Sequence, residues 1–203
     1  MNRVVFLDRD GVICRDRADY VKSWEEFRFI PGVKAALRAL REAGITVLII
    51  TNQSVINRGI LTREALDNLH RKMIRAIART GGEISGIYYC PHRPEEGCDC
   101  RKPGTALLKQ AARDHHLNLK KCVFVGDTLK DLEAGKGVGC RTILVQTGQG
   151  RETLKKLFQR DHSGSNTWII RDLSRGTDLI IRLMKFDGSR STLGQDTQGG
   201  AGG

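Results

Sequence analysis

Short apolar runs alternate with amphipathic segments along most of this chain of 203 residues. The runs have the length of β-strands, and the segments between them repeat their apolar residues at helical spacing. The predicted strands are Val4–Leu7, Thr46–Ile50, Ile87–Tyr89, Cys122–Val125, Thr142–Val145 and Trp168–Ile170, and the predicted helices are Val33–Ala43, Thr62–Arg79, Thr105–His116, Asp131–Lys136, Glu152–Arg160 and Thr177–Met184. Strands that alternate with helices form βαβ units. The pattern therefore predicts an α/β fold: a mostly parallel, Rossmann-like sheet with helices on both faces.

The composition is that of one folded domain with a polar tail. A chain of this length with 39% hydrophobic residues can bury one substantial core, so we expect a single domain over 1–186. Residues 187–203 hold six glycines and one large apolar side chain, which predicts a disordered tail. No apolar run is long enough to span a membrane, and the chain starts with a strand rather than a signal peptide. We expect a cytoplasmic monomer without a membrane partner.

The formal net charge of +11 is compatible with nucleic acid, a membrane surface or small anionic substrates. Lys and Arg are spread along the predicted helix surfaces, and aromatic residues make up only 5% of the chain, which leaves few platforms for stacking bases. A solvated basic surface is the simpler interpretation. Nucleic-acid binding or processing of a 3′ end is therefore not expected and is kept only as an alternative.

The first predicted strand ends in two carboxylates, Asp8 and Asp10, followed by Gly11. Residues i and i+2 of a strand point the same way, so both carboxylates can face one pocket. Such a pair can hold a divalent cation while one carboxylate attacks phosphorus and the other moves protons. The plainer interpretation is an Asp-Gly turn with two solvated carboxylates. This segment alone does not decide between the two.

Three further polar clusters follow predicted strands or precede a helix. Thr51, Asn52, Gln53 and Ser54 follow the second strand, Arg101 and Lys102 precede a helix, and Asp127 and Asp131 follow the fourth strand. Hydroxyl, amide and cationic groups suit phosphate oxygens, although each cluster alone has a plainer interpretation as a cap or a solvated turn. In a parallel sheet these groups gather outside the carboxyl ends of the strands.

The order and spacing of Asp8/Asp10, Thr51, Lys102 and Asp127/Asp131 resemble the four motifs of the haloacid dehalogenase superfamily of phosphatases. The resemblance implies that Asp8 is the nucleophile and Asp10 the general acid and base. It implies that Thr51 and Lys102 bind the transferring phosphoryl group. It also implies Mg²⁺ between the Asp8 carboxylate, the Asp10 carbonyl and Asp127, with Asp131 orienting the metal shell or Lys102. A cation fits the chemistry, because an anionic nucleophile can attack a phosphate only if the charge between them is neutralised.

Three cysteines and a histidine crowd into the loop 90–100. Cys90, His92, Cys98 and Cys100 match a Cys₃His zinc site, and the loop has no apolar residues to form a core of its own. Four protein ligands leave no open position for water, so this zinc is expected to be structural and to fix Arg101 and Lys102. The alternative is a loop of unliganded, redox-sensitive thiols.

This loop together with Arg101-Lys102-Pro103 resembles the zinc-containing subgroup of the superfamily, whose members act on heptose 1,7-bisphosphate or on histidinol phosphate. The segments around 19–32, 52–59 and 146–148 are more similar to the heptose branch. The resemblance implies removal of the 7-phosphate of the heptose bisphosphate in the pathway to nucleotide-activated heptose, with histidinol phosphate as the alternative substrate. The implied substrate-binding residues are Asp16, Asp19, Asn52, Gln53, Ser54, Arg58 and Arg101. The chain departs from the subgroup where Gly104 follows Pro103 directly.

The remaining cysteines and histidines lack spacing that indicates a site. Cys14, Cys122 and Cys140 lie outside the loop 90–100 and are expected to be buried structural thiols. His70, His115, His116 and His162 are expected at the surface or at helix ends.

Overall fold

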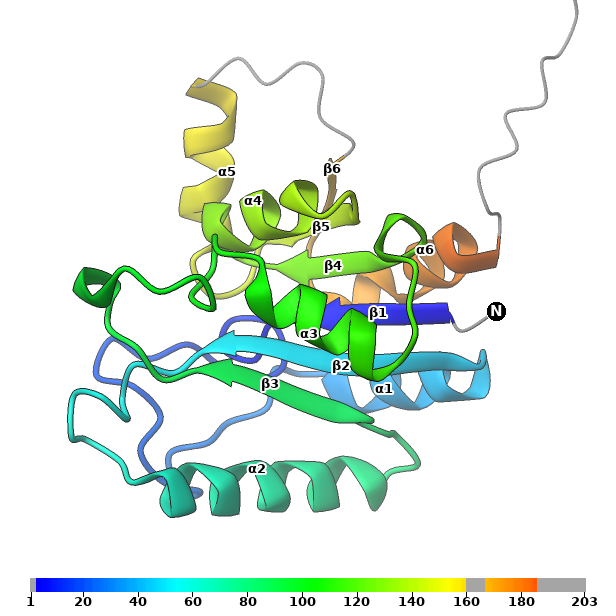
Figure 1. The fold of residues 1–203 in the computed structure, drawn as a ribbon. Helices are drawn as coiled ribbons and strands as arrows, with labels where there is room; N and C mark the ends of the chain where they lie inside the picture. The colour runs from blue at the N-terminus through cyan, green and yellow to red at the C-terminus, as the bar shows by residue number, and fades with distance from the viewer. Residues whose placement is uncertain (1–2, 160–166, 186–203) are drawn as a thin grey trace, which may run out of the picture.

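The computed structural model describes residues 3–159 and 167–185, which form a sheet with helices on both faces (Figure 1). The elements are β1 (Arg3–Leu7), α1 (Val33–Glu42), β2 (Ile45–Asn52), α2 (Arg63–Ala78), β3 (Gly86–Cys90), η1 (Pro94–Glu96), α3 (Ala106–Asp114), η2 (Leu119–Lys121), β4 (Val123–Gly126), α4 (Leu129–Gly137), β5 (Arg141–Val145), α5 (Gly150–Gln159), β6 (Thr167–Ile170) and α6 (Leu173–Lys185). In the described part of the chain the strands form one parallel six-stranded sheet in the order β3-β2-β1-β4-β5-β6. The predicted strands and the parallel α/β fold are confirmed.

The central strand β1 is buried on both faces, as a parallel sheet between two helical layers requires. Val5 and Leu7 face a core that includes apolar side chains of α1, α2 and α6. Val4 and Phe6 face a second core with side chains of α3 and α4. The alternation of side chains along β1 thus divides its four apolar residues between two cores.

The order in which the chain adds strands to the sheet reverses between β1 and β4. From β1 it proceeds outward to β2 and β3, and then crosses back to place β4 on the other side of β1. In sheets of this kind, ligands bind outside the carboxyl ends of the strands at the reversal point. Asp8 follows β1 and Asp127 follows β4, so both lie at that point.

Three helices begin earlier than the sequence predicts, and one of them is α5, which begins at Gly150 rather than Glu152. α4 begins at Leu129 rather than Asp131, because Thr128 is its N-cap and forms a reciprocal capping box with Asp131. α6 begins at Leu173 rather than Thr177, and its first turn is tied through the Gly176 N–H to Asp172. The first residues of α4 and α6 thus depend on hydrogen bonds at the N-terminal turn rather than on the spacing of apolar residues.

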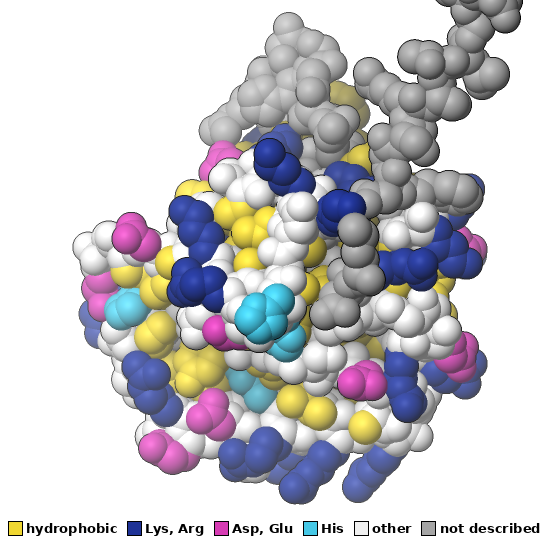
Figure 2. Space-filling model, turned by 45° about the vertical axis from the view of Figure 1, so that its right-hand side comes forward, with side chains coloured by type: hydrophobic (Ala, Val, Ile, Leu, Met, Phe, Trp, Pro, Cys, Tyr) yellow, Lys and Arg dark blue, Asp and Glu magenta, His cyan; other side chains and the backbone are white. Residues whose placement is uncertain are grey.

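The predicted tail, 187–203, and His162 lie outside the described residues. Within the described ranges, no helix has both the length and the apolar character needed to cross a bilayer. On the face drawn in Figure 2, Lys and Arg side chains are spread among acidic, polar and hydrophobic ones rather than gathered into one patch.

Candidate active site

Asp8 lies at the end of β1, where the sheet continues through a hydrogen bond from its own N–H to the Val125 carbonyl at 3.0 Å. Its carboxylate is almost fully buried and accepts the Arg9 N–H at 2.8 Å. The ammonium of Lys102 lies 2.9 Å from the same carboxylate. A buried carboxylate beside a single fixed cation is suited to nucleophilic attack on an anion, since the cation offsets part of the repulsion.

Lys102 is held from three sides. Besides Asp8, its Nζ lies 2.6 Å from Asp131 Oδ1 and donates to the Ile50 carbonyl at 2.9 Å. Burial alone would lower the pKa of Lys102, but the attraction of Asp131 and Asp8 raises that pKa above its ordinary value. Lys102 is therefore a permanent cation, and its position is determined by the ends of β1 and β2 and by α4.

Three buried carboxylates, those of Asp8, Asp127 and Asp131, each offer an oxygen within 4.8 Å of the other two. Burial first, and then repulsion from the neighbouring carboxylates, raises the pKa of Asp8 to about 7 and that of Asp127 to about 9. Lys102 offsets only part of this excess of negative charge. Oxygen ligands at such density fit a hard divalent cation, which would restore the ionised form of each carboxylate.

Asp127 is placed by close backbone contacts that only glycine permits. A Cβ on Gly11 or on Gly148 would lie 2.1 Å from its Oδ2, and both glycines have positive φ. Oδ2 also accepts the Gln149 N–H at 2.8 Å. Two glycines from distant parts of the chain thus make room for a carboxylate that is predicted to bind metal.

Asp131 has a structural role as well as a place in the carboxylate cluster. Its Oδ2 accepts from the backbone N–H of Thr128 at 2.9 Å and from the Thr128 hydroxyl at 2.7 Å. Its Oδ1 faces Lys102. Both oxygens of Asp131 are therefore engaged by the protein, and its contact with Lys102 is what the role implied by the resemblance would require.

Asp10 is held by a network rather than by solvent. Arg9 donates to it through Nε at 3.2 Å and through Nη2 at 3.0 and 2.8 Å, and Gln53 Nε2 donates to Oδ2 at 2.9 Å. Burial by itself would raise the pKa of Asp10, but the Arg9 charge and these hydrogen bonds lower it. Cys14, buried as expected, is also 3.3 Å from Asp10 Oδ1. Asp10 is thus ionised and fixed in place.

The polar residues after β2 have different tasks. Gln53 is buried and connects Asp10 to the Thr51 hydroxyl, to which its Nε2 donates at 3.0 Å. The Asn52 amide joins the backbone of Lys102, accepting its N–H at 3.0 Å and donating to its carbonyl at 3.2 Å. Ser54 is also buried. The segment therefore organises neighbouring residues as much as it lines the site.

A cavity of about 520 Å³ opens over these groups. It is lined by Asp8, Asp10, Asp16, Arg17, Ala18, Tyr20, Thr51, Asn52, Arg101, Lys102, Asp127, Thr128, Leu129, Lys130, Asp131, Gln149, Thr153 and Lys156. All of the predicted catalytic and Mg²⁺ residues are therefore brought together, along with Asp16, Asn52 and Arg101. Asp19, Gln53, Ser54 and Arg58 are not among the lining residues.

The cavity includes three cations that the sequence reasoning did not single out. Arg17, Lys130 and Lys156 come from the segment after β1, from α4 and from α5. No motif marks them, since each lies on a segment that reads as a solvated basic surface. Only the tertiary arrangement reveals that they surround the same opening.

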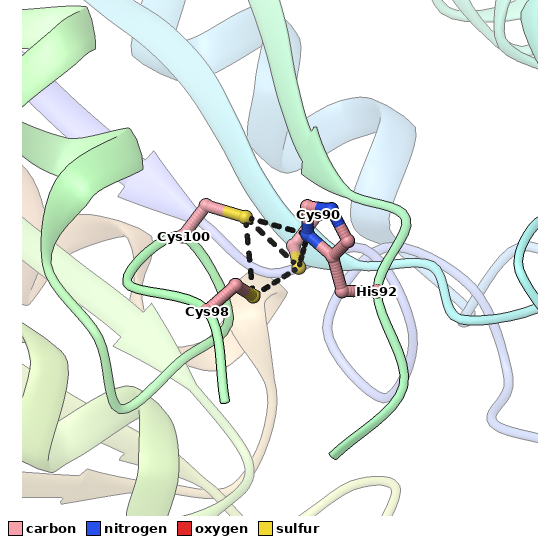
Figure 3. A group of neighbouring side chains, drawn as sticks. All are labelled: Cys90, His92, Cys98 and Cys100. Atoms are coloured by element: carbon pink, nitrogen blue, oxygen red, sulfur yellow. Dashed lines mark hydrogen bonds between the residues drawn. The ribbon is translucent and has the colours of Figure 1, made fainter. Parts of the chain in front are cut away.

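Cys90, His92, Cys98 and Cys100 point toward a common centre, as Figure 3 shows. The Sγ atoms lie 3.2 to 3.6 Å apart, and His92 Nδ1 lies 3.1 Å from the Cys100 Sγ. Ligands about 2.3 Å from a tetrahedral zinc stand roughly 3.8 Å from one another, so the cluster is close to the size that zinc requires. The donor set fits structural zinc.

The loop 90–100 is tied directly to the cavity. Arg101, the next residue, donates through Nη1 to the carbonyl of His92 at 3.0 Å. The turn after Pro103 closes through the Gly104 N–H to the Arg101 carbonyl at 2.7 Å, and a Cβ on Gly104 would lie 2.2 Å from the Asp99 carbonyl. This tight turn, in which residue 104 directly follows Pro103, is therefore possible because residue 104 is glycine.

Family models and relatives agree with this geometry. A model described as haloacid dehalogenase-like hydrolase matches residues 5–76, and one described as HAD-hydrolase-like matches 99–175. D-glycero-beta-D-manno-heptose-1,7-bisphosphate 7-phosphatase of Pseudomonas putida is 45% identical over 154 residues, which are 76% of this chain and 88% of that protein. The chain belongs to the haloacid dehalogenase-like hydrolases. The family predicted from the four motifs is thereby confirmed.

Other relatives of this hydrolase carry the same name. The protein of Bordetella bronchiseptica is 43% identical over 152 residues, which are 75% of this chain and 85% of that protein. A crystal structure of D,D-heptose 1,7-bisphosphate phosphatase from B. bronchiseptica, complexed with magnesium and phosphate, has a TM-score of 0.83 at 38% identity. That match covers 89% of this hydrolase and 98% of the solved chain.

Proposed function

We propose that this hydrolase is a Mg²⁺-dependent phosphatase that removes the 7-phosphate of D-glycero-β-D-manno-heptose 1,7-bisphosphate. The observation that carries the proposal is the buried Asp8 carboxylate 2.9 Å from Lys102, within a cluster of carboxylates on the wall of a polar cavity. The substrate is supported by the shared name of relatives that this chain matches over most of their length. The reaction would belong to nucleotide-activated heptose biosynthesis in the cytoplasm.

Mg²⁺ would be held by the carboxylates of Asp8 and Asp127 and by the backbone carbonyl of Asp10. When bound, it supplies positive charge between the nucleophile and the phosphoryl oxygens. Lys102 supplies the second positive charge from the other side of Asp8. The raised pKa values of Asp8 and Asp127 support the assignment, because in this cluster the negative charge of the carboxylates exceeds the positive charge of Lys102.

In the first step an Asp8 oxygen forms a bond to phosphorus while the bond from phosphorus to the sugar oxygen breaks. Without substrate Asp10 is ionised beside Arg9; the negative charge of the bound phosphate would favour its protonated form, and Asp10 then gives this proton to the departing oxygen. In the second step water attacks the phosphorus of the aspartyl phosphate, Asp10 takes the proton of the water, and Asp8 leaves as a carboxylate. Thr51 and Lys102 hold the phosphoryl oxygens throughout, and both line the cavity.

The second phosphate of the substrate needs cations of its own. Arg58 is not among the lining residues, whereas Arg17, Arg101, Lys130 and Lys156 are. We assign the sugar and its 1-phosphate to this set. Lys130 and Lys156 are its most available members: among the described residues Lys130 has no ion pair, and the Lys156 ammonium lies 3.9 Å from Glu152 on the same helix, whereas Arg17 is paired with Asp19 at 2.9 Å. Zinc in the loop 90–100 would fix Arg101 through the His92 carbonyl.

A phosphate-release panel tests the function. Heptose 1,7-bisphosphate, fructose bisphosphate, histidinol phosphate and a 3′-phosphorylated oligonucleotide are each incubated with and without Mg²⁺. The proposal requires the heptose ester to give the highest kcat/KM and the reaction to need Mg²⁺. A preference for histidinol phosphate would change the substrate and leave the mechanism standing, whereas release only from the oligonucleotide would refute the sugar assignment.

A further inference from the structure

Arg9 lies between the two catalytic carboxylates, yet its side chain is turned away from the cavity. It is 1% exposed and is not among the residues that line the cavity. A guanidinium is never deprotonated in a protein and is costly to bury without partners. The hydrogen-bond partners of Arg9 therefore indicate its role in the structure.

One side of Arg9 binds Asp10 and the other binds a histidine. Nε and Nη2 form a fork on the Asp10 carboxylate, with an ion pair of 2.8 Å between Nη2 and Oδ2. Nη1 lies 3.2 Å from Nε2 of His70. Because Arg can only donate, Nε2 of His70 accepts this hydrogen bond, and the proton of the neutral ring is on Nδ1.

The surroundings of His70 keep its imidazole ring neutral and fixed in position. It lies in α2, is 5% exposed, and packs edge-on against Tyr89 with 5.9 Å between ring centroids. Burial and the Arg9 charge lower the pKa of His70 to about 3, so the ring keeps its acceptor at neutral pH. The expectation of a surface or helix-end histidine was wrong for His70, which lies four residues after Leu66 and three before Met73 and therefore shares the buried face of α2.

We propose that His70 is a positioning residue that acts through Arg9 to fix the Asp10 carboxylate in the geometry needed for proton transfer to the leaving oxygen. The proposal rests on the role of Asp10 given under the proposed function. Among the described residues the His70 side chain hydrogen-bonds only to Arg9, and Gln53 donates to the same Asp10 Oδ2 that Arg9 Nη2 binds. Without Nε2 of His70, the Arg9 guanidinium would keep only its hydrogen bonds to Asp10.

A general acid matters most when the leaving group is poor. An alkoxide needs its proton as the phosphorus–oxygen bond breaks, whereas p-nitrophenolate leaves with little protonation. A displaced Asp10 should therefore slow release of an alkyl alcohol more than release of p-nitrophenol. A general loosening of the fold would slow both alike, so the ratio of the two rates separates positioning from stability.

The experiment compares His70→Leu, which cannot accept a hydrogen bond, with His70→Gln, which can. kcat/KM is measured for heptose 1,7-bisphosphate, glycerol 3-phosphate and p-nitrophenyl phosphate. We expect His70→Leu to lose about 10- to 100-fold on the two alkyl esters and less than about threefold on p-nitrophenyl phosphate. His70→Gln should recover most of the loss.

His115→Leu is the matched control. His115 packs edge-on against Tyr88 at 6.4 Å between ring centroids, as His70 does against Tyr89, whereas the hydrogen-bond partners of the Arg9 side chain are Asp10 and His70. It should leave the ratio unchanged. If His70→Leu does not fold, Arg9→Lys, which keeps the charge and loses the fork, should show the same selective loss. Equal losses on alkyl and aryl esters, or no recovery in His70→Gln, would overturn the proposal. Activity on glycerol 3-phosphate without activity on the heptose ester would refute the proposed substrate alone.

Discussion

At the scale of single residues, Asp8 tests the covalent mechanism most directly. Asp8→Asn keeps the size of the side chain but cannot form an acyl phosphate, so turnover should fall by more than about 10³-fold. The unfolding temperature should stay the same or rise, because the change removes one of three mutually repelling buried carboxylates. Phosphate release and thermal unfolding measure the two effects. Substantial turnover by Asp8→Asn in Mg²⁺ would exclude the covalent route.

Lys130 and Lys156 test how the second phosphate is bound. The double change to Ala should raise KM for heptose 1,7-bisphosphate by roughly tenfold or more, the loss expected for charge-assisted contacts, while p-nitrophenyl phosphate is affected much less. Arg58→Ala is the matched control, since it removes a cation that does not line the cavity. A larger effect from Arg58→Ala than from the double change would reverse the assignment.

At the scale of elements, the loop 90–100 should depend on zinc. Cys98→Ser should lose the metal and raise KM, because Arg101 is tied to the His92 carbonyl and would no longer be fixed. The expected metal content of the unaltered chain is about one zinc per chain, measured by elemental analysis without added metal. Cys140→Ala removes a buried thiol outside the loop and should keep both zinc and KM. A zinc-free chain with full activity would contradict the assignment.

At the scale of the whole molecule, pH and Mg²⁺ should act on stability together. The folded-state pKa values of Asp8 and Asp127 lie above those of an unfolded chain, so the folded protein holds protons that the unfolded chain has released. Without Mg²⁺ the free energy of unfolding should therefore fall as pH rises from about 7 to about 9, toward the folded-state pKa of Asp127. His70 does not interfere, because its lowered pKa affects stability only below the ordinary histidine range.

Mg²⁺ should raise the unfolding temperature more at the alkaline end of this range, since the metal competes with protons for the same carboxylates. Thermal scans in buffers depleted of Mg²⁺ on an ion-exchange resin, rather than with a chelator that would also remove zinc, make the comparison. Asp131→Asn, which keeps a side-chain acceptor for Thr128, should flatten the pH dependence. A Mg²⁺ effect that does not change with pH would contradict the carboxylate cluster as the metal site.

The sequence predicts most of the sheet, because each strand is an apolar run bounded by polar residues. It also predicts which catalytic groups meet, since carboxyl ends of parallel strands share one edge. It cannot predict that Gln53 turns inward to Asp10 or that Lys156 on α5 reaches the cavity. Those facts depend on helix rotation and on loop conformation, which the apolar period does not specify. His70 is a different case, because its spacing from Leu66 and Met73 places it on the buried face of α2 and only its contact with Arg9 depends on the tertiary fold.

The placement of β4 beside β1 has a consequence for synthesis of the chain. Asp8, Thr51, the loop 90–100 and Lys102 are all translated before β4, whereas Asp127 emerges only after it. Until β4 pairs with β1, one edge of β1 has no partner and its apolar residues are open to other strands. A nascent chain that lacks β4 therefore exposes an unpaired strand edge and also lacks Asp127. Pairing of β4 with β1 closes this edge, and the segment after β5 then supplies the Gln149 N–H that binds Asp127.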